Sequence, residues 1–384
     1  MKKPLFSSSD WRNFLKITAD QNIYKLRSFL SDKIELTEFN PNNGIPNLDE
    51  CDALFVRTVT ALNSNSVPLL PNSLKLLGTA SSGNNHIDTP YFEQKGIDVI
   101  DANGCNAKAV SEYVMTSLLL WGIQNSTSLQ SLKYGIIGVG AVGKEVQKQF
   151  DTFGLSYVSY DPPRAERDST FNSIALEELL SCDVLTFHVP LTKTGVHNTF
   201  HWLDEAKLNS HSYKLIINAA RGGVIDEQAL LRAMDNRRVK DVIIDVWENE
   251  PNFNSILAQK AFISTPHIAG YSEQAKLKAT QLLVEKFGDI FGLEMNHPVD
   301  LFEEKNLEIA DLDYSLQELL LRLNPLKEYD MALRDLISRP DKESLFKKLR
   351  VDRRYRFEYP YLRISETLLN KFEELKLLGL RKTN

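Results

Sequence analysis

Residues 134–143 read Tyr-Gly-Ile-Ile-Gly-Val-Gly-Ala-Val-Gly. The apolar run 134–137 predicts a strand that leads directly into three closely spaced glycines, Gly138, Gly140 and Gly143. Residues 142–150 then have the apolar spacing of a helix. Glycines between a strand and a helix allow a tight turn and let a pyrophosphate approach the amides at the helix N-terminus. This stretch therefore predicts a dinucleotide-binding turn rather than a plain packing turn.

An acidic residue in the following strand supports this interpretation. Asp161 ends the apolar run 157–161 and stands 18 residues after Gly143, close to the spacing typical of such sites. Its carboxylate can accept hydrogen bonds from both ribose hydroxyls and would repel a 2′-phosphate, which favours NAD over NADP. Arg164 and Arg167 follow closely and weaken that preference.

Short apolar runs and helical patterns alternate on both sides of the turn. This alternation is typical of parallel βαβ units and predicts an α/β protein with a doubly wound parallel Rossmann sheet. It also predicts a flavodoxin-like substrate domain before that sheet and a small C-terminal α+β domain after it. The expected strands are residues 14–18, 51–56, 74–78, 97–100, 184–188, 215–218, 242–245 and 262–264, and the expected helices are residues 23–30, 109–123, 176–180, 227–235 and 272–291.

Three domains are expected from this order of elements. Residues 1–108 form a substrate-binding domain that residues 271–295 complete, after a loose extension over residues 1–12. Residues 109–270 form the NAD-binding domain. Residues 296–384 form the C-terminal domain, and the mixture of apolar and basic residues there predicts a surface for a partner, most simply a second copy of the chain.

Composition excludes several classes of protein. The chain has 384 residues, of which 42% are hydrophobic and 25% charged, as expected for a soluble globular protein. Its three cysteines are far apart and show no spacing for a metal, so we expect neither a metal site nor disulfides, and a cytoplasmic location. The longest apolar stretch is too short to span a membrane. Lysines and arginines of the C-terminal segment alternate with leucine and tyrosine, which argues against nucleic-acid binding.

Three polar residues at strand ends predict the chemistry. Arg221 follows a strand and can grip a carboxylate with two parallel hydrogen bonds. His267 follows another strand, and an imidazole titrates close to neutral pH, so it can accept a hydroxyl proton. A carboxylate on the far ring nitrogen would fix the tautomer, and both Glu248 and Glu250 are candidates from spacing alone.

Four motifs that contain these residues resemble the D-isomer-specific 2-hydroxyacid dehydrogenases. The resemblance covers residues 14–291 and implies that Arg221, Glu250 and His267 are catalytic, with Glu250 rather than Glu248 as the acid. The motifs are Gly-Val-Gly-Ala-Val-Gly at 138–143, Asn-Ala-Ala-Arg-Gly-Gly-Val-Ile-Asp at 218–226, Asp-Val-Trp-Glu-Asn-Glu-Pro at 245–251 and Thr-Pro-His-Ile-Ala-Gly at 265–270.

Shorter motifs at 56–60, 78–83, 104–107, 161–165 and 267–271 are similar to one branch of this family. The branch oxidises 4-phospho-D-erythronate to 2-oxo-3-hydroxy-4-phosphobutanoate with NAD, in the formation of pyridoxal 5′-phosphate, and its C-terminal domain implies a homodimer. Substrate contacts carry over to Thr58, Ser81 and Tyr271. For the substrate phosphate we consider Arg57 first and the cluster 350–356 of a partner subunit second. The expected cofactor contacts are Gly138, Gly140, Val142, Gly143, Asp161, Val189, Ala219, Ala220, Arg221, Asp245 and Gly270.

Two other functions are compatible with these residues. A dehydrogenase for another 2-hydroxyacid, such as 3-phosphoglycerate, would use the same strand-end residues. A non-catalytic NAD sensor that resembles the corepressors on this fold would also keep them, because a fold does not fix a function.

Overall fold

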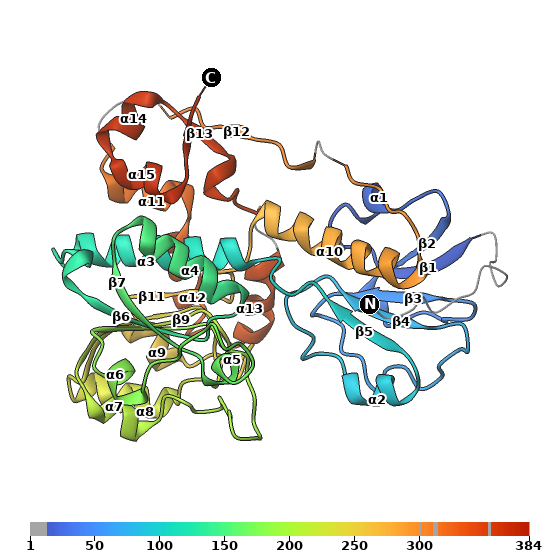
Figure 1. Ribbon diagram of the computed structural model, residues 1–384, viewed down its shortest axis with the longest axis horizontal. Helices are drawn as coiled ribbons and strands as arrows, with labels where there is room; N and C mark the ends of the chain where they lie inside the picture. Colours follow the sequence, from blue (N-terminus) through green and yellow to red (C-terminus); the bar gives the residue numbers. More distant parts are fainter. Residues whose placement is uncertain (1–13, 299–300, 310–313, 352–354, 384) are drawn as a thin grey trace. The chain divides into compact units, whose positions relative to one another are not determined.

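The computed structural model describes residues 14–298, 301–309, 314–351 and 355–383. The extension predicted for residues 1–12 lies outside these ranges. Internal contacts divide the chain into two compact units. Unit 1 comprises Met1–Asn106 and Glu273–Glu303, and unit 2 comprises Ala107–Ser272 and Glu304–Asn384. Each unit is built around its own parallel sheet (Figure 1).

The sheet of unit 1 has five parallel strands in the order β2-β1-β3-β4-β5, which is the order of flavodoxin-like sheets. The polar edge strand β2 does not appear among the strands expected from the sequence. The strands are β1 (Leu15–Asp20), β2 (Ile34–Phe39), β3 (Ala53–Val56), β4 (Leu76–Thr79) and β5 (Asp98–Asp101).

Both faces of this sheet are covered by apolar side chains. In β3, Phe55 packs on one face against Phe287 of α10 (Glu273–Phe291), with their ring centroids 5.7 Å apart. Leu54 points to the other face, towards Phe92 of α2 (Thr89–Gln94). This alternation follows from the two-residue period of a strand. Helix α1 (Leu26–Phe29) is much shorter than the predicted helix 23–30, and a one-turn helix, η1 (Pro41–Asn43), follows β2.

Unit 2 contains six parallel strands in the order β11-β10-β9-β8-β6-β7. The chain first adds β7 on one side of β6 and then β8 on the other, so the direction of winding switches between β6 and β8. Ligands of doubly wound sheets bind at such a switch point. The strands are β6 (Lys133–Ile137), β7 (Ser156–Tyr160), β8 (Val184–Phe187), β9 (Tyr213–Asn218), β10 (Val239–Ile244) and β11 (Ile263–Ser264).

Helices cover both faces of the unit 2 sheet (Figure 1). One face packs against α3 (Ala107–Gln124) and α4 (Ala141–Thr152). The opposite face packs against a second group of helices and its own apolar core. That group contains α6 (Leu176–Leu180), α7 (Glu205–Ser210), α8 (Glu227–Asp235) and α9 (Ser255–Lys260), while α5 (Pro162–Ala165) follows β7 and η2 (Leu129–Ser131) precedes β6.

The C-terminal segment, residues 304–384, shares an apolar core with α3 and α4. It mixes helices with a three-stranded parallel sheet of order β12-β13-β14. Its elements are β12 (Lys305–Asn306), α11 (Leu316–Leu323), α12 (Leu326–Arg334), α13 (Lys342–Val351), η4 (Tyr359–Tyr361), β13 (Leu362–Ile364), α14 (Glu366–Lys371), α15 (Glu373–Leu378) and β14 (Arg381–Lys382).

This segment covers the edge strand of the unit 2 sheet. Asp330 of α12 accepts hydrogen bonds from the backbone N–H of Ser264 at 2.7 Å and from its hydroxyl at 2.8 Å. Arg334 pairs with Asp330 and donates to the carbonyl oxygen of Ala261 at 2.8 Å. The backbone N–H of Ser264, on the open side of this edge strand, is therefore paired by the C-terminal segment.

Helix α3 is buried around most of its circumference. Its Glu112 carboxylate forms a buried ion pair with Arg356, at 2.6 Å, and accepts the backbone N–H of Tyr359 at 2.9 Å. The buried carboxylate of Glu112 in α3 is thus paired by residues of the C-terminal segment of the same chain. Among the described helices, none has both the length and the apolar character that a membrane crossing demands.

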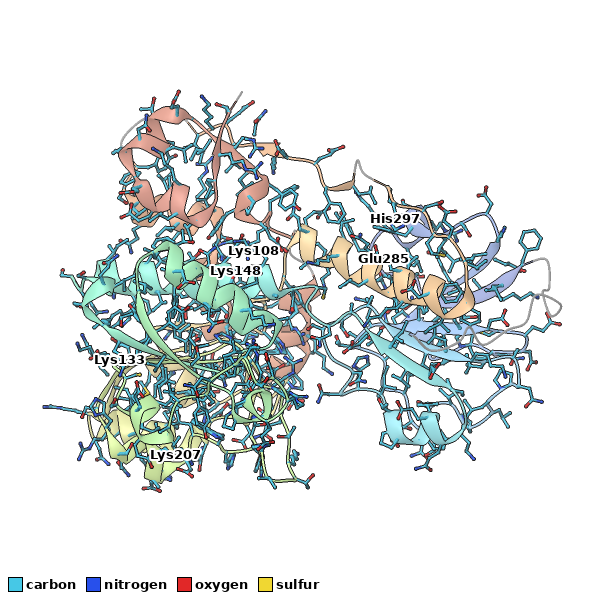
Figure 2. All side chains as sticks on the ribbon, in the orientation of Figure 1. Lys108, Lys133, Lys148, Lys207, Glu285 and His297 are labelled. Carbon is cyan, nitrogen blue, oxygen red and sulfur yellow. The ribbon has the colours of Figure 1, made fainter. Side chains whose placement is uncertain are left out.

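Surface charge in unit 2 is mixed. Three of the lysines labelled in Figure 2, Lys133, Lys148 and Lys207, lie on different elements. Each forms an ion pair with a nearby acid. In unit 1, His297 lies 3.7 Å from Glu285. In the part of the chain that the structure describes, no group of three or more His, Cys, Asp and Glu side chains is arranged to hold a metal ion.

Candidate active site

The glycine turn connects β6 with α4, as the sequence predicts. Gly138 has φ 85°, which favours glycine, and a Cβ there would lie 2.7 Å from the carbonyl oxygen of His188. A Cβ at Gly143 would collide with the carbonyl oxygen of Gly138. Around Gly140, by contrast, a Cβ would meet no atom within 4 Å. The turn is therefore tight where it packs on β8 and open at Gly140, at the N-terminus of α4, which fits a pyrophosphate.

Asp161 lies beside this turn and fixes its geometry. One carboxylate oxygen accepts the backbone N–H of Val139 at 2.7 Å, and the other accepts that of Arg164 at 3.0 Å. The Arg164 guanidinium lies 4.1 Å from the Phe171 ring and 3.2 Å from Asp168. Arg164 is thus held by Asp168 and Phe171, and the preference for NAD expected from Asp161 stays a prediction.

The loop after β9 carries Arg221. The Asn218 side chain donates to the carbonyl oxygen of Arg221 at 3.1 Å and accepts the N–H of Ala220 at 3.1 Å, which folds the loop back on its strand. A Cβ at Gly222 would collide with the carbonyl oxygen of Trp247, so this loop packs backbone to backbone on the loop after β10. Arg221 is thereby brought close to the residues that follow β10.

Asp245, at the end of β10, organises the loop after β11. Its buried carboxylate accepts the Thr265 hydroxyl at 2.6 Å and the backbone N–H groups of Ile268 and Ala269 at 2.8 and 2.9 Å. Burial raises the pKa of Asp245, although His267 lowers it in part. The His267 N–H donates to the Asp245 carbonyl oxygen at 2.7 Å, and His267 has φ 58°, a conformation uncommon for a residue other than glycine.

His267 and Glu250 form a hydrogen-bonded pair. Nδ1 of His267 lies 2.8 Å from Oε2 of Glu250, whose Oε1 accepts the Trp247 N–H at 2.9 Å. Burial alone would raise the pKa of Glu250, but His267 and the Trp247 N–H lower it overall. An ionised carboxylate only accepts hydrogen bonds, so Nδ1 carries the proton and Nε2 of the neutral ring can accept one.

The other acid that spacing left open has a different partner. Glu248 lies 2.9 Å from Nε2 of His201, and its backbone N–H donates to Glu227 at 2.8 Å. Of the two acids, only Glu250 is hydrogen-bonded to His267 in the described residues. The geometry therefore agrees with the choice that the family resemblance implies.

Arg221 completes the group of three polar residues. Its guanidinium is mostly buried: burial lowers its pKa, and the nearby Glu250 carboxylate raises it in part. Arg221, Glu250 and His267 come from the loops after β9, β10 and β11, three neighbouring parallel strands. The carboxyl ends of these strands thus bring a cation, an acid and an imidazole to the same edge of the unit 2 sheet.

Val189, Ala219, Ala220 and Gly270 also belong to loops at this edge. Val189 is within van der Waals reach of Gly138, since its Cγ1 would lie 2.7 Å from a Cβ at that glycine. The cofactor contacts expected from the sequence therefore all fall in unit 2, either in loops or in the first turn of α4. Their contact with NAD stays a prediction.

The expected substrate residues are divided between the units. Thr58 and Ser81 follow the neighbouring strands β3 and β4 of unit 1, whereas Tyr271 belongs to unit 2. The Ser81 hydroxyl lies 2.8 Å from that of Thr79. Arg57, our first choice for the phosphate, is already paired: its Nε donates to the fully buried Asp20 carboxylate at 2.8 Å.

Supporting residues around the catalytic loop were not anticipated from the sequence. The Tyr113 hydroxyl of α3 lies 2.8 Å from the Thr265 hydroxyl, which in turn donates to Asp245. From the C-terminal segment, Arg350 and Tyr355 contact Tyr271. Only the concentration of arginine and tyrosine at 350–356 hinted at a functional role for that stretch.

Comparison with known proteins is consistent with this site. Residues 120–269 match the family model described as D-isomer specific 2-hydroxyacid dehydrogenase, NAD binding domain. Among solved structures, NAD-bound 3-phosphoglycerate dehydrogenase from Entamoeba histolytica superposes with a TM-score of 0.59 at 23% identity, over 73% of this chain and 96% of that one. A glyoxylate reductase from Paecilomyes thermophila gives a TM-score of 0.57 at 22% identity, with coverage of 73% and 96%. These structures share the fold.

Curated relatives are more similar in sequence. The erythronate-4-phosphate dehydrogenase of Escherichia coli O139:H28 is 38% identical over 290 residues, which cover 74% of this chain and 76% of that protein. The enzyme of the same name from Escherichia coli strain SMS-3-5 is 39% identical with the same coverage. This similarity places the chain in the erythronate-4-phosphate dehydrogenase family of the D-isomer-specific 2-hydroxyacid dehydrogenases, and the protein is an NAD-dependent dehydrogenase that oxidises a hydroxyacid.

Proposed function

We propose that this chain oxidises 4-phospho-D-erythronate to 2-oxo-3-hydroxy-4-phosphobutanoate, with NAD as the oxidant, as a step in pyridoxal 5′-phosphate (vitamin B6) biosynthesis. The printed name of the curated relatives supports the substrate. The observation that carries the chemistry is the 2.8 Å hydrogen bond between His267 and Glu250. A neutral imidazole held in one tautomer by an ionised acid is suited to general base catalysis.

In this proposal Arg221 binds the substrate carboxylate through its guanidinium. His267 accepts the proton of the C2 hydroxyl at Nε2, while the C2–H bond breaks and the C2–O bond becomes a carbonyl. When bound, NAD supplies the acceptor for the hydride that leaves C2. Glu250 stabilises the imidazolium that forms, because its carboxylate faces the protonated Nδ1. In the reverse direction His267 returns the same proton to the oxygen.

Residues at the carboxyl edge of the unit 2 sheet would hold the cofactor. The turn at Gly138, Gly140, Val142 and Gly143 would hold the pyrophosphate at the N-terminus of α4, and Asp161 would hold the ribose. The Gly138 N–H itself already donates to the Tyr160 carbonyl oxygen at 2.9 Å, so Gly138 would contribute by its close packing and not by its amide. Further contacts come from the strand-end loops, at Val189, Ala219, Ala220, Arg221, Asp245 and Gly270. The open space at Gly140 and the placement of Asp161 beside the turn support this assignment.

Substrate contacts would come from Thr58 and Ser81 of unit 1 and from Tyr271 of unit 2. We retain three domains as a working division: residues 1–108 with 271–295 bind substrate, residues 109–270 bind NAD, and residues 296–384 mediate a homodimer. The mixture of apolar and basic residues in the C-terminal segment supports this last assignment. A monomeric mass in solution at micromolar concentration would contradict the dimer.

The test is NADH formation by the purified chain with a panel of 2-hydroxyacids. We expect the highest kcat/KM with 4-phospho-D-erythronate and a strong preference for NAD over NADP. A higher kcat/KM with 3-phosphoglycerate would assign the enzyme to a different substrate. Tight NAD binding without NADH formation from any acid would favour the NAD sensor.

A further inference from the structure

The C-terminal segment runs along the catalytic loop within unit 2. Ser272, five residues after His267, pairs with Arg356 in a β-bridge. Its hydroxyl also donates to the buried Glu358 carboxylate at 2.7 Å. The segment is therefore fixed directly beside the residues that follow the catalytic histidine.

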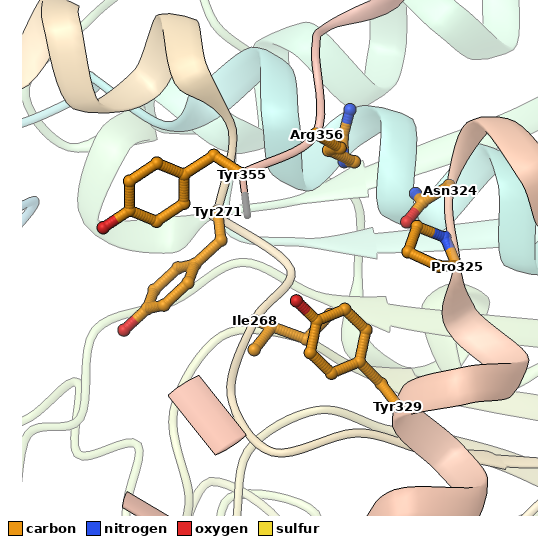
Figure 3. Close-up of a pocket in the computed structure, with 7 residues that line it drawn as sticks. All are labelled: Ile268, Tyr271, Asn324, Pro325, Tyr329, Tyr355 and Arg356. Atoms are coloured by element: carbon orange, nitrogen blue, oxygen red, sulfur yellow. The ribbon is translucent and has the colours of Figure 1, made fainter. Parts of the chain in front are cut away.

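Tyr271 is enclosed by two side chains of this segment. The Arg350 guanidinium lies 5.8 Å from the centroid of the Tyr271 ring, within the range of a cation–π contact. The Tyr355 ring lies 6.2 Å away at an interplanar angle of 77°. Figure 3 shows the hydroxyls of Tyr271 and Tyr355 turned away from Asn324 and Pro325, which line the other side of a small pocket.

Arg350 differs from Arg356, another described arginine of this segment, in its hydrogen bonds. Its Nε is buried and has no hydrogen-bond partner among the described residues. Arg356, by comparison, is fully engaged by the Glu112 carboxylate and by the Ala109 carbonyl oxygen at 2.8 Å. A buried N–H without an acceptor is costly, so a ligand that supplies an acceptor at Arg350 would be favoured.

The positive charges of two arginines near the catalytic acid favour an anionic ligand. Burial alone would lower the pKa of Arg350, but a hydrogen bond with Tyr271 and the nearby Glu250 carboxylate raise it overall. Arg221 also feels the charge of Glu250. The catalytic acid thus lies within electrostatic range of two guanidinium groups, whereas a substrate with a single carboxylate requires only one of them.

We propose that Arg350, together with the Tyr271 hydroxyl, forms a second anion subsite that binds the phosphate of the substrate. The inference rests on the proposed function and deepens it: the C-terminal segment of the same subunit selects phosphorylated over unphosphorylated 2-hydroxyacids. Arg221 holds the carboxylate at one end, and Arg350 holds the phosphate at the other. A guanidinium can bind two phosphate oxygens through parallel N–H groups, which suits this role.

The experiment compares 4-phospho-D-erythronate with D-erythronate as substrates for Arg350→Gln, Arg350→Lys and wild type. For Arg350→Gln we expect KM for the phosphorylated acid to rise about 10- to 100-fold, since a charged hydrogen bond contributes roughly 1.5–3 kcal/mol. The loss with D-erythronate should be much smaller. Arg350→Lys should restore part of the affinity, because it keeps the charge but not the planar fork. Inorganic phosphate should inhibit wild type better than Arg350→Gln.

Two further variants serve as controls. Arg339→Gln removes an exposed arginine that pairs with Asp341 at 3.3 Å and should leave both substrates unaffected. Arg57→Gln tests the competing position in unit 1. NAD affinity and the melting temperature of each variant show whether the fold is intact, and Arg350→Lys keeps the test open if the glutamine variant does not fold.

Equal losses on the two substrates would overturn the inference and leave Arg350 as a residue that only positions Tyr271 and Glu250. A selective loss in Arg57→Gln rather than Arg350→Gln would also overturn it, by moving the phosphate to unit 1. These outcomes differ from a failure of the proposed function, in which wild type itself would prefer another acid to 4-phospho-D-erythronate. Wild type that oxidises only unphosphorylated acids would contradict both.

Discussion

The two units contain similar parallel sheets but very different loops. In unit 2, β6 leads into a glycine turn and the 12-residue helix α4. In unit 1, β1 leads into a turn without glycine, in which the N–H of Asn22 donates to Asp20 at 2.9 Å, and the helix that follows has four residues. The comparison teaches that parallel strands create a favourable edge, whereas the loop residues decide whether that edge can bind a dinucleotide.

The strand ends differ in their chemistry as well. At the end of β3 in unit 1, Arg57 is neutralised by the buried Asp20. In unit 2, Glu250 fixes an imidazole that is free to exchange a proton at its other nitrogen. We therefore expect unit 2 to contain the reacting groups and unit 1 to contribute substrate contacts, and the following predictions test this division.

The largest effect is expected for His267→Gln. Loss of the general base should lower kcat by about 10²- to 10⁴-fold with little change in NAD affinity, because the glycine turn is untouched. His201→Gln is a matched control, since His201 also pairs with a glutamate, Glu248, at 2.9 Å. Steady-state kinetics and NAD titration check both variants. Similar losses in kcat for the two would remove the special role of His267.

The next prediction concerns cofactor binding, in the variant Gly140→Ala. The added Cβ meets no atom within 4 Å, so the fold should remain stable, but it would obstruct the pyrophosphate. We expect NAD affinity to fall about 10-fold, which corresponds to about 1.4 kcal/mol. Isothermal titration and thermal unfolding measure the two quantities separately.

Gly96→Ala in unit 1 should show the opposite pattern. The space around Gly96 is also open, but its φ of 77° makes alanine strained, so stability should fall while NAD affinity is kept. Unchanged NAD affinity in Gly140→Ala would argue against the cofactor assignment of the turn.

Asp330→Ala tests the cover over strand β11. The variant removes the acceptor for two Ser264 donors and the partner of Arg334. We expect the free energy of unfolding to fall by about 1–3 kcal/mol, because buried donors lose their acceptor. Denaturant unfolding measures the change, with the exposed Asp335→Ala as control. Equal, small changes in the two variants would mean that the C-terminal segment does not support the sheet.

The last prediction concerns the stability of the protein in acid. Burial lowers the pKa of His188 in unit 2 to about 3, and that of His86 in unit 1 to about 4. A histidine with a depressed pKa in the folded state contributes stability above its unfolded pKa, and this stability is lost as pH falls towards the folded pKa. At pH 5, the free energy of unfolding should be lower by on the order of 1–2 kcal/mol than at neutral pH because of His188.

His188→Gln should therefore reduce the loss of melting temperature between pH 7 and pH 5. His86→Gln should behave similarly, but its effect should level off near pH 4, whereas the effect of His188 continues towards pH 3. An unchanged pH profile in His188→Gln would show that its ring is protonated in the folded protein.

The sequence predicted the α/β fold because strands buried on both faces read as short apolar runs. The glycine turn with Asp161 predicted the NAD cofactor, and the four motifs predicted the family. The sequence did not predict β2, an edge strand that carries Glu35 and Glu38. It also predicted a helix over residues 23–30, whereas α1 covers only Leu26–Phe29. Polar side chains on an edge obscure the apolar pattern. The short helices α2, α7 and α9 were also missed, since six residues carry little periodicity.

The polar residues of the candidate site could be predicted because each lies in the loop that follows a strand, and parallel strands end at one edge. The contact between Arg350 and Tyr271 could not be predicted from the sequence. These residues are far apart in the chain, and no local pattern reports such a pairing. Likewise, spacing could not separate Glu248 from Glu250, because the choice depends on which carboxylate the folded loop turns towards His267.

The most direct test of the account is a structure of the chain with NADH and 4-phospho-D-erythronate bound, a pair that cannot react. We predict that Nε2 of His267 lies within about 2.6–3.2 Å of the C2 hydroxyl oxygen, with Glu250 still on Nδ1. The Arg221 guanidinium should contact the substrate carboxylate. A bound substrate whose C2 hydroxyl faces away from His267, or whose carboxylate is held elsewhere, would contradict the account.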